Sequence, residues 1–426
     1  MAGSVRTTGV QPLPVGFTRQ KAYWPAVTIA LLIASLCLVL SQAVFPPGGP
    51  VPDSPSYTQQ AIEMSHGNFV SIPWVGEVGQ DPADRSGMFP SRYPPGYSFA
   101  LMPFAAIAPH GEDGVAYGNA FLVWLLVVAA VACAILLGGW TAGLVALLIL
   151  MTSTFIWSSA EDILSDAFGA LLAVLGLLCV IGLAKAQTRR GAMCWALGLG
   201  AACGYAITTR FVLGLLLVAA LIVVPWRAKW LTIIAAAPFV LALGVYQWVV
   251  FGSPLKTGYD YWLPGLAPFQ IGSAFRWDLP GDSIYIHAER LNGALLSWLG
   301  LGDGPAQAVI GHTPPLITYP AVLLGLYWVF LPPFVALAGL AWLWYSRSST
   351  SARFIALAAA FNVLVFLPYT FMGARFIAPA AVLLIVATSA GFAEVTRRLA
   401  PVFGQRSQPA LVARGPADPE CGPQGH

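Results

Sequence analysis

The chain has 426 residues, of which 58% are hydrophobic and only 9% are charged. Soluble domains carry roughly 25% charged residues, so this composition excludes an ordinary soluble protein. The formal net charge is only +3, and the basic residues are spread over short loops without forming a patch, which excludes a nucleic-acid-binding protein.

Ten apolar runs predict membrane-spanning helices, because about 20 apolar residues are needed to cross a hydrocarbon core about 30 Å thick. In chain order, the predicted spans are 24–45, 116–137, 141–157, 162–184, 192–208, 211–226, 231–252, 321–344, 354–371 and 376–395. The run at 97–108 is too short to cross and predicts an interfacial or re-entrant helix. The first run is too long for a cleaved signal peptide, and no small-residue cleavage site follows it. The sequence therefore predicts an all-α, polytopic integral membrane protein.

The distribution of charge predicts the orientation of the protein in the membrane. With ten spans, both termini lie on one side, which receives 14 of the 21 basic residues but only 3 of the 18 acidic ones. Short loops rich in Lys and Arg stay in the cytoplasm. We therefore expect cytoplasmic termini in a plasma or inner membrane, with two long extracytoplasmic loops, 46–115 and 253–320. The expected segments are a cytoplasmic N-terminal segment (1–23), a membrane domain (24–398) and a disordered cytoplasmic tail (399–426).

An acid and an arginine stand out in the first long outer loop. Asp53 follows the first predicted span, and an Arg-Tyr-Pro-Pro-Gly-Tyr turn that begins at Arg92 leads the chain back into apolar sequence. Asp81 and Asp84 belong to a polar stretch that is typical of a solvated turn. An acid and a basic turn at the outer surface indicate chemistry at the membrane interface, on a lipid-borne substrate.

Further acids open the predicted span 162–184. Asp162 and Asp166 are four residues apart, so we expect them to share a helix face, with Asp166 one turn deeper. Ionisable groups at such depth are costly and usually face a protein interior or a wet cavity. Glu161 and Asp162 are better explained as acidic residues that favour a helix N-terminus. Asp166 is the candidate functional acid.

Three basic residues stand on the outer side, against the charge trend. Arg210 lies between two spans, Lys256 lies in the second long loop, and Arg375 opens the last span. Each could simply extend to the interface as a single surface cation. Together, beside isolated acids, they predict a receptor for a lipid phosphate, since Arg and Lys bind phosphate.

Other residue types carry weaker signals. None of the six cysteines lies in an outer loop, and neither a CxxC pair nor a cluster with the five histidines indicates zinc. The outer-loop aromatic residues are typical of a membrane-interface belt, although one or two could stack on a sugar ring: Trp74, Tyr259, Tyr261, Trp262 and Trp277. From the cysteines and histidines we therefore expect neither a zinc site nor a structural disulfide.

The order of these residues resembles the GT-C glycosyltransferases, multi-span enzymes that use polyprenyl-phosphate sugars. That family includes the protein O-mannosyltransferases and the lipid A aminoarabinose transferase, and the likeness is nearest to its bacterial envelope-glycan branch. The resemblance covers about residues 24–395. It rests on Asp53-x-x-x-Tyr57-x-x-x-Ala61, Arg92-Tyr-Pro-Pro-Gly-Tyr97, Leu164-Ser-Asp166, Thr209-Arg210, GSPLKTGY at 252–259, and Arg375-Phe-x-x-Pro379.

The resemblance implies a role for each matching residue. Asp53 corresponds to the first-loop acid taken as general base, and Asp166 to a second acid. Arg92 and Arg375 correspond to residues that contact the lipid phosphate, although Tyr93 separates Arg92 from the Pro-Pro turn and Phe376 replaces the usual Tyr. Lys256 and Arg210 are further candidates for the phosphate. Substrate contacts are implied for Tyr57, Tyr93, Tyr97 and Tyr259.

The family's first-loop acid is often one of a carboxylate pair. In this chain Ser54 follows Asp53, so the pair that usually holds a divalent ion is missing, and the expectation is no cofactor, with a divalent metal left open.

The chemistry is consistent with these residues. A sugar on a phosphate already has a good leaving group, so transfer requires a base for the acceptor hydroxyl and cations for the departing phosphate. We therefore predict transfer of a hexosyl or pentosyl group to an envelope glycan, lipid or protein acceptor, with inversion at the anomeric carbon.

Two alternatives remain at this point, a transporter or lipid-glycan flippase and a non-catalytic assembly subunit. A transporter should show inverted repeats and charges near the bilayer midplane. The charges of this chain cluster at the outer interface instead.

Overall fold

A computed structural model describes residues 31–32, 35–36, 53–76, 84–262, 334–366 and 374–404. Only residues 31–32 and 35–36 of the predicted span 24–45 are described. The N-terminal segment 1–23, the second long loop beyond residue 262 and most of the predicted span 321–344 lie outside the described residues. Of the predicted disordered tail 399–426, residues 399–404 are described and are helical, so the tail begins later than predicted.

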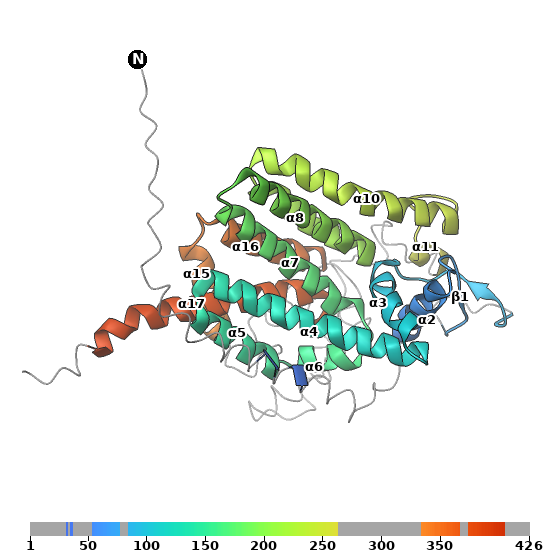
Figure 1. The fold of residues 1–426 in the computed structure, drawn as a ribbon, viewed down its shortest axis with the longest axis horizontal. Coiled ribbons are helices and arrows are strands. Elements are labelled where there is room, and N and C mark those ends of the chain that lie inside the picture. Colours follow the sequence, from blue (N-terminus) through green and yellow to red (C-terminus); the bar gives the residue numbers. More distant parts are fainter. Residues whose placement is uncertain are drawn as a thin grey trace, which may run out of the picture.

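The described chain is a bundle of helices with one small pair of strands (Figure 1). By length and composition, five described helices can cross a membrane, and a sixth span is added if a bent helix pair is counted as one. Each of the five lies where an apolar run predicted a span. They are α4 (Gly111–Gly138), α7 (Ser165–Lys185), α8 (Arg189–Thr209), α10 (Trp226–Phe251) and α17 (Ala378–Gly404).

Shorter helices complete the bundle. The predicted span 211–226 is a 3-10 turn, η2 (Phe211–Leu213), followed by α9 (Gly214–Val223), and the predicted span 354–371 contains α16 (Thr350–Phe366). The described end of the predicted span 321–344 is α15 (Phe334–Tyr345). The all-helical membrane fold is confirmed.

The predicted span 141–157 is not one straight helix. It forms α5 (Trp140–Thr152) and α6 (Thr154–Glu161), which are bent by 57°. The bend occurs at Ser153, whose backbone is extended with φ −77° and ψ 125°.

The start of the next helix also differs from the expectation. Asp162 follows α6 with an extended backbone, and α7 begins only at Ser165. The expectation that Asp162 and Asp166 share one helix face is therefore wrong, and so is the assignment of Glu161 and Asp162 to the helix N-terminus. Asp166 alone lies in the first turn of α7.

The described part of the first long loop contains two helices, and the second of them matches the short helix predicted at 97–108. They are α2 (Ser54–Ser65) and α3 (Gly96–Ile107), and both lie at one end of the bundle in Figure 1. Between them, strands β1 (Ile72–Pro73) and β2 (Met88–Phe89) pair antiparallel, with Ile72 opposite Phe89. Helix α11 (Gly258–Trp262) follows α10 and lies beside this loop (Figure 1).

Small residues allow the helices to pack closely. Gly200 and Gly204 are four residues apart on α8 and face the backbone of Thr232 and Ala236 on α10. This small-xxx-small spacing lets two helix backbones approach in a membrane, where apolar side chains alone give little driving force for association. Helix α17 is the most buried of the spanning helices and packs against α4, α5 and α7.

Candidate active site

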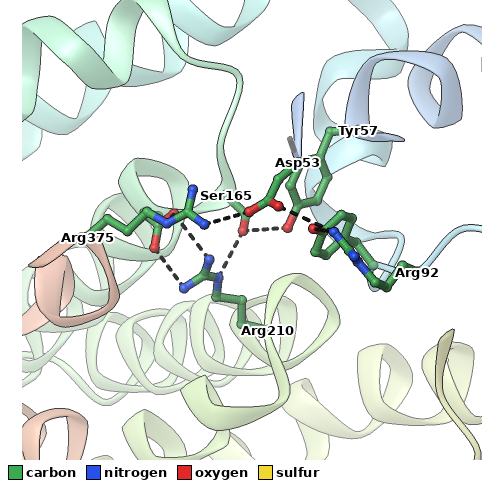
Figure 2. A network of polar contacts seen from close by, with 8 residues as sticks. Asp53, Tyr57, Arg92, Ser165, Arg210 and Arg375 are labelled. Atoms are coloured by element: carbon green, nitrogen blue, oxygen red, sulfur yellow. Dashed lines mark hydrogen bonds and ion pairs between the residues drawn. The ribbon is translucent and has the colours of Figure 1, made fainter. Parts of the chain in front are cut away.

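Five charged side chains meet at the helix ends on one side of the bundle (Figure 2). Asp53 immediately precedes α2, and Arg92 lies in the turn that leads to α3. Asp166 lies in the first turn of α7, and Arg210 follows the last residue of α8. Arg375 belongs to η4 (Ala374–Ile377), a 3-10 turn directly before α17. Segments that are far apart in the sequence therefore supply one polar site.

Asp53 lies between two arginines in Figure 2. Its Oδ2 is 2.6 Å from Nη2 of Arg375, and its Oδ1 is 3.4 Å from Nη2 of Arg92. Burial alone would raise the pKa of Asp53. The charge of Arg375, a hydrogen bond from Tyr93 and the charge of Arg92 outweigh burial, so the pKa lies below its ordinary value of 3.8. Asp53 is therefore an anion at neutral pH, and its side chain is 16% exposed.

Asp166 forms a separate and more buried pair. Both of its oxygens face Arg210, with 2.7 Å between Oδ1 and Nη1 and 3.1 Å between Oδ2 and Nη2. The Asp166 side chain is only 2% exposed. The second arginine, Arg375, has its Nε 4.0 Å from Oδ2 of Asp166, so it links the two acids. A buried carboxylate held by both ends of one guanidinium is a rigid support for that guanidinium.

Ser165 joins this pair to α2, in the first long loop. Its Oγ accepts a hydrogen bond from Nε of Arg210 at 2.9 Å and shares another with the hydroxyl of Tyr57, also at 2.9 Å (Figure 2). Burial raises the pKa of Tyr57 to about 12, so its hydroxyl keeps its proton at neutral pH. The Tyr57 ring stacks on Tyr93 at 4.5 Å and meets Tyr97 edge-on at 5.1 Å.

The predicted substrate-contacting tyrosines differ in their surroundings. Tyr57 and Tyr97 are fully buried, and they support the site through packing and hydrogen bonds. Tyr93 contacts Arg92 through its hydroxyl, and the Arg92 guanidinium lies 4.7 Å from the centre of its ring. Tyr259 packs edge-on against Tyr93 at 5.9 Å. A direct contact of any of these tyrosines with substrate stays a prediction.

Lys256 is not part of the network. Its side chain is exposed on the turn before α11, and within the described ranges it forms no ion pair with the acids of the site. Arg210 instead completes the set of three arginines.

Asn119, on α4, is a site residue that the sequence analysis missed. Its Oδ1 accepts a hydrogen bond from the Tyr97 hydroxyl at 2.7 Å. Its Nδ2 donates to the backbone oxygens of Ser159, Ala160 and Asp162 at 2.9, 3.2 and 3.3 Å. Asn119 therefore fixes the connection between α6 and α7, which precedes Asp166. The available signal was an amide side chain near the start of an apolar run, where an unpartnered polar group is costly.

The electrostatics of the network favour an anion. Three arginines face two carboxylates, which leaves a formal surplus of one positive charge. Nη1 of Arg375 is buried, and among the described residues it has no hydrogen-bond acceptor. A buried guanidinium nitrogen without an acceptor is costly, and an anionic oxygen in the site would satisfy it.

The two carboxylates do not form a metal site in this arrangement. Each of them faces arginine, and the described part of the chain holds no group of three His, Cys, Asp or Glu side chains that could bind a metal ion.

Comparison with known families gives one match. The sequence model for dolichyl-phosphate-mannose-protein mannosyltransferase matches residues 91–253, which include Arg92, Asp166 and Arg210. No curated protein sequence gave a significant match.

Solved structures of two kinds share the fold. ArnT from Cupriavidus metallidurans bound to undecaprenyl phosphate aligns with a TM-score of 0.56 and 17% identity, over 90% of this chain and 62% of that one. The Archaeoglobus fulgidus oligosaccharyltransferase tethered to an acceptor peptide aligns with a TM-score of 0.52 and 15% identity, over 92% of this chain and 52% of that one. The chain thus spans between half and two thirds of the length of these structures. The chain shares the fold of these two structures, which agrees with the resemblance to the GT-C glycosyltransferases in the sequence.

Proposed function

We propose that this protein is a membrane glycosyltransferase that takes a sugar from a polyprenyl-phosphate donor. The acceptor is an envelope glycan, a lipid or a protein, and the reaction takes place on the extracytoplasmic face. The observation that carries the proposal is the surplus positive charge of the buried network, together with the Arg375 Nη1 that has no acceptor among the described residues.

The three arginines suit a phosphate leaving group. Arg92 and Arg375 approach Asp53 from two sides, so an anionic oxygen near Asp53 would lie within reach of both guanidiniums. Planar guanidinium groups bind phosphate through paired N–H donors and keep their charge at any physiological pH. Asp166 and Ser165 hold the guanidinium of Arg210 in place, so of the three arginines Arg210 has the most structural role.

The two acids have different surroundings, which supports different roles. Asp166 has both oxygens engaged by Arg210 and is almost fully buried, so an acceptor hydroxyl cannot readily reach it. Asp53 is partly exposed, is ionised at neutral pH, and has a long contact of 3.4 Å on one side. We therefore assign the general base to Asp53, and to Asp166 the positioning of Arg210 and Arg375.

The proposed reaction is a single displacement. The acceptor oxygen attacks the anomeric carbon, the bond from that carbon to the phosphate oxygen breaks, and the acceptor proton passes to Asp53. The arginines stabilise the negative charge that develops on the departing phosphate, which is the form of stabilisation expected to contribute most. Attack opposite the leaving group inverts the anomeric centre.

The comparisons support the lipid donor. The matching family is named for dolichyl-phosphate-mannose, and the ArnT structure holds undecaprenyl phosphate. The extracytoplasmic site rests on the charge bias of the loops, which leaves 7 basic and 15 acidic residues on the side of the network.

The test is consumption of the donor by purified protein in lipid nanodiscs. A panel of polyprenyl-phosphate sugars is incubated with the protein and a mixture of envelope acceptors, and free polyprenyl phosphate is measured. At least one donor should be consumed by the wild type and not by Arg375→Ala. Arg347→Ala, which removes an exposed arginine distant from the network, is the matched control and should retain activity. Turnover that is equal in wild type and Arg375→Ala would overturn the assignment of the site, and a protein that consumes no donor would overturn the function.

A further inference from the structure

Helix α11 packs against the short segment that carries Arg92. Nε1 of Trp262 donates a hydrogen bond to the backbone oxygen of Pro90 at 2.8 Å. Tyr259 meets the ring of Tyr93 edge-on, and Tyr93 in turn contacts Arg92. A five-residue helix of the second outer loop therefore contacts the segment both before and after the arginine.

Gly258 makes the closest of these contacts. A Cβ atom at this position would lie 2.4 Å from the backbone oxygen of Ser91 and 2.5 Å from that of Arg92. Real side chains do not approach backbone atoms this closely, so any residue with a Cβ would displace one of the two backbones. Glycine is thus required here by a backbone-to-backbone contact and not by a turn conformation.

The start of α11 is fixed by its own side chains. Oδ2 of Asp260 accepts hydrogen bonds from the backbone N–H of Thr257 at 2.7 Å and from its hydroxyl at 2.9 Å. Trp262 is almost fully buried and packs against Trp74 and Phe89 beside the paired strands. The helix is therefore a defined support for its neighbour.

The same turn is held on its other side by the end of α8. A Cβ atom on Gly96 would lie 2.6 Å from the backbone oxygen of Thr208, and the Tyr205 hydroxyl donates to the backbone oxygen of Gly96 at 2.9 Å. The turn that carries Arg92 is thus in close backbone contact with α11 on one side and with α8 on the other.

We infer that α11 is a positioning element for Arg92, through which the second outer loop sets the affinity of the site for the phosphate of the lipid donor. This inference rests on the proposed function, because it takes Arg92 to be a phosphate ligand. Gly258 and Trp262 both contact the backbone of the Arg92 segment, so they act through Arg92 and not on the substrate.

Binding of undecaprenyl phosphate to the protein in nanodiscs tests this inference. Gly258→Ala should weaken binding about tenfold or more, since a small misplacement of a binding group has a large effect. Gly244→Ala is the matched control, because its added Cβ would meet nothing closer than Pro254 at 3.9 Å, and it should bind like the wild type. In an Arg92→Ala background, Gly258→Ala should change binding by less than about twofold, because the two substitutions act on the same contact.

The outcomes separate the inference from the proposed function. No binding by the wild type would overturn the proposed function and this inference with it. If the wild type binds the lipid and Gly258→Ala binds it equally well, only the role of α11 is overturned. The same holds if Gly258→Ala weakens binding by the same factor with and without Arg92. If Gly258→Ala does not fold, Trp262→Phe is the second variant, because it keeps an aromatic ring and removes the hydrogen bond to Pro90. It should weaken binding about threefold, as expected for one neutral hydrogen bond, and only when Arg92 is present.

Discussion

Substitution of Asp53 by asparagine separates catalysis from donor binding. The amide keeps the shape of the side chain and can still accept a hydrogen bond from Arg375, but it cannot accept a proton at neutral pH. Loss of a general base lowers turnover by about 10²–10⁴-fold. Donor binding should respond differently, because Asp53 and the donor phosphate bind the same guanidinium groups.

The magnitude of the effect on binding follows from the ion pairs. The short contact of 2.6 Å joins Asp53 and Arg375, whose side chains are 16% and 24% exposed, so solvent screens the pair in part. Pairs of this kind are worth up to about 1 kcal/mol, which corresponds to roughly fivefold in a binding constant. Removing the competing carboxylate should therefore leave undecaprenyl phosphate binding unchanged or tighten it up to about fivefold.

Turnover and binding are measured on the same nanodisc preparation. The expected result is a large loss of turnover with equal or tighter donor binding. Near-normal turnover in a folded Asp53→Asn protein would remove Asp53 from the chemical step, and Asp166 would be the next candidate. A tenfold weaker donor affinity would contradict the competition between Asp53 and phosphate.

Three further outcomes are expected. The pKa of Asp53 in the free protein lies below 3.8, so protonation of Asp53 should lower kcat/KM only below that pH. A bound phosphate should raise the pKa of Asp53 and move the acid limb of the kcat profile to higher pH. An Asp53-dependent limb near pH 6 in kcat/KM would contradict the ion pairs. Arg210→Ala leaves the buried Asp166 without its two-point partner and should lower the free energy of unfolding by about 3–5 kcal/mol, and adding Asp166→Asn should recover part of this loss in thermal unfolding. Lys256→Ala removes an exposed cation outside the network, so donor binding should change by less than about twofold; a loss comparable to that of Arg375→Ala would return Lys256 to the site.

The sequence predicted the helices of this protein better than their ends. Long apolar runs identify α4, α7, α8, α10 and α17, because only a helix satisfies every backbone group within a hydrocarbon core. Hydropathy does not report where the backbone leaves the helix, so the bend at Ser153 and the late start of α7 were missed. The connection between α6 and α7 is held by hydrogen bonds from another helix, those of Asn119 on α4, which hydropathy does not report either.

The sequence predicted which residues belong to the site better than it predicted which acid pairs with which arginine. Asp53 and Arg92 stood out by their positions, after the first predicted span and at the start of the Pro-Pro turn, and Arg375 stood out as a basic residue against the charge trend. Which acid pairs with which arginine depends on how helices far apart in the sequence pack, and no local pattern encodes that. Gly258 lay in a recognised motif, but its close backbone contact with Arg92 exists only in the folded protein.

The spacing of the ion pairs along the chain has a consequence for biosynthesis. Arg210 follows Asp166 by 44 residues, so that pair can close as soon as the α7–α8 hairpin has been inserted into the membrane. Arg375 follows Asp53 by 322 residues, so the nascent chain must carry Asp53 without its closest partner until the last described helix is made. Until then Arg92, 39 residues away, is the cation that can pair with Asp53 among the described partners of this acid. The full network of ion pairs therefore forms only after Arg375 has been translated, and a chain released before that point would lack the guanidinium that links both acids.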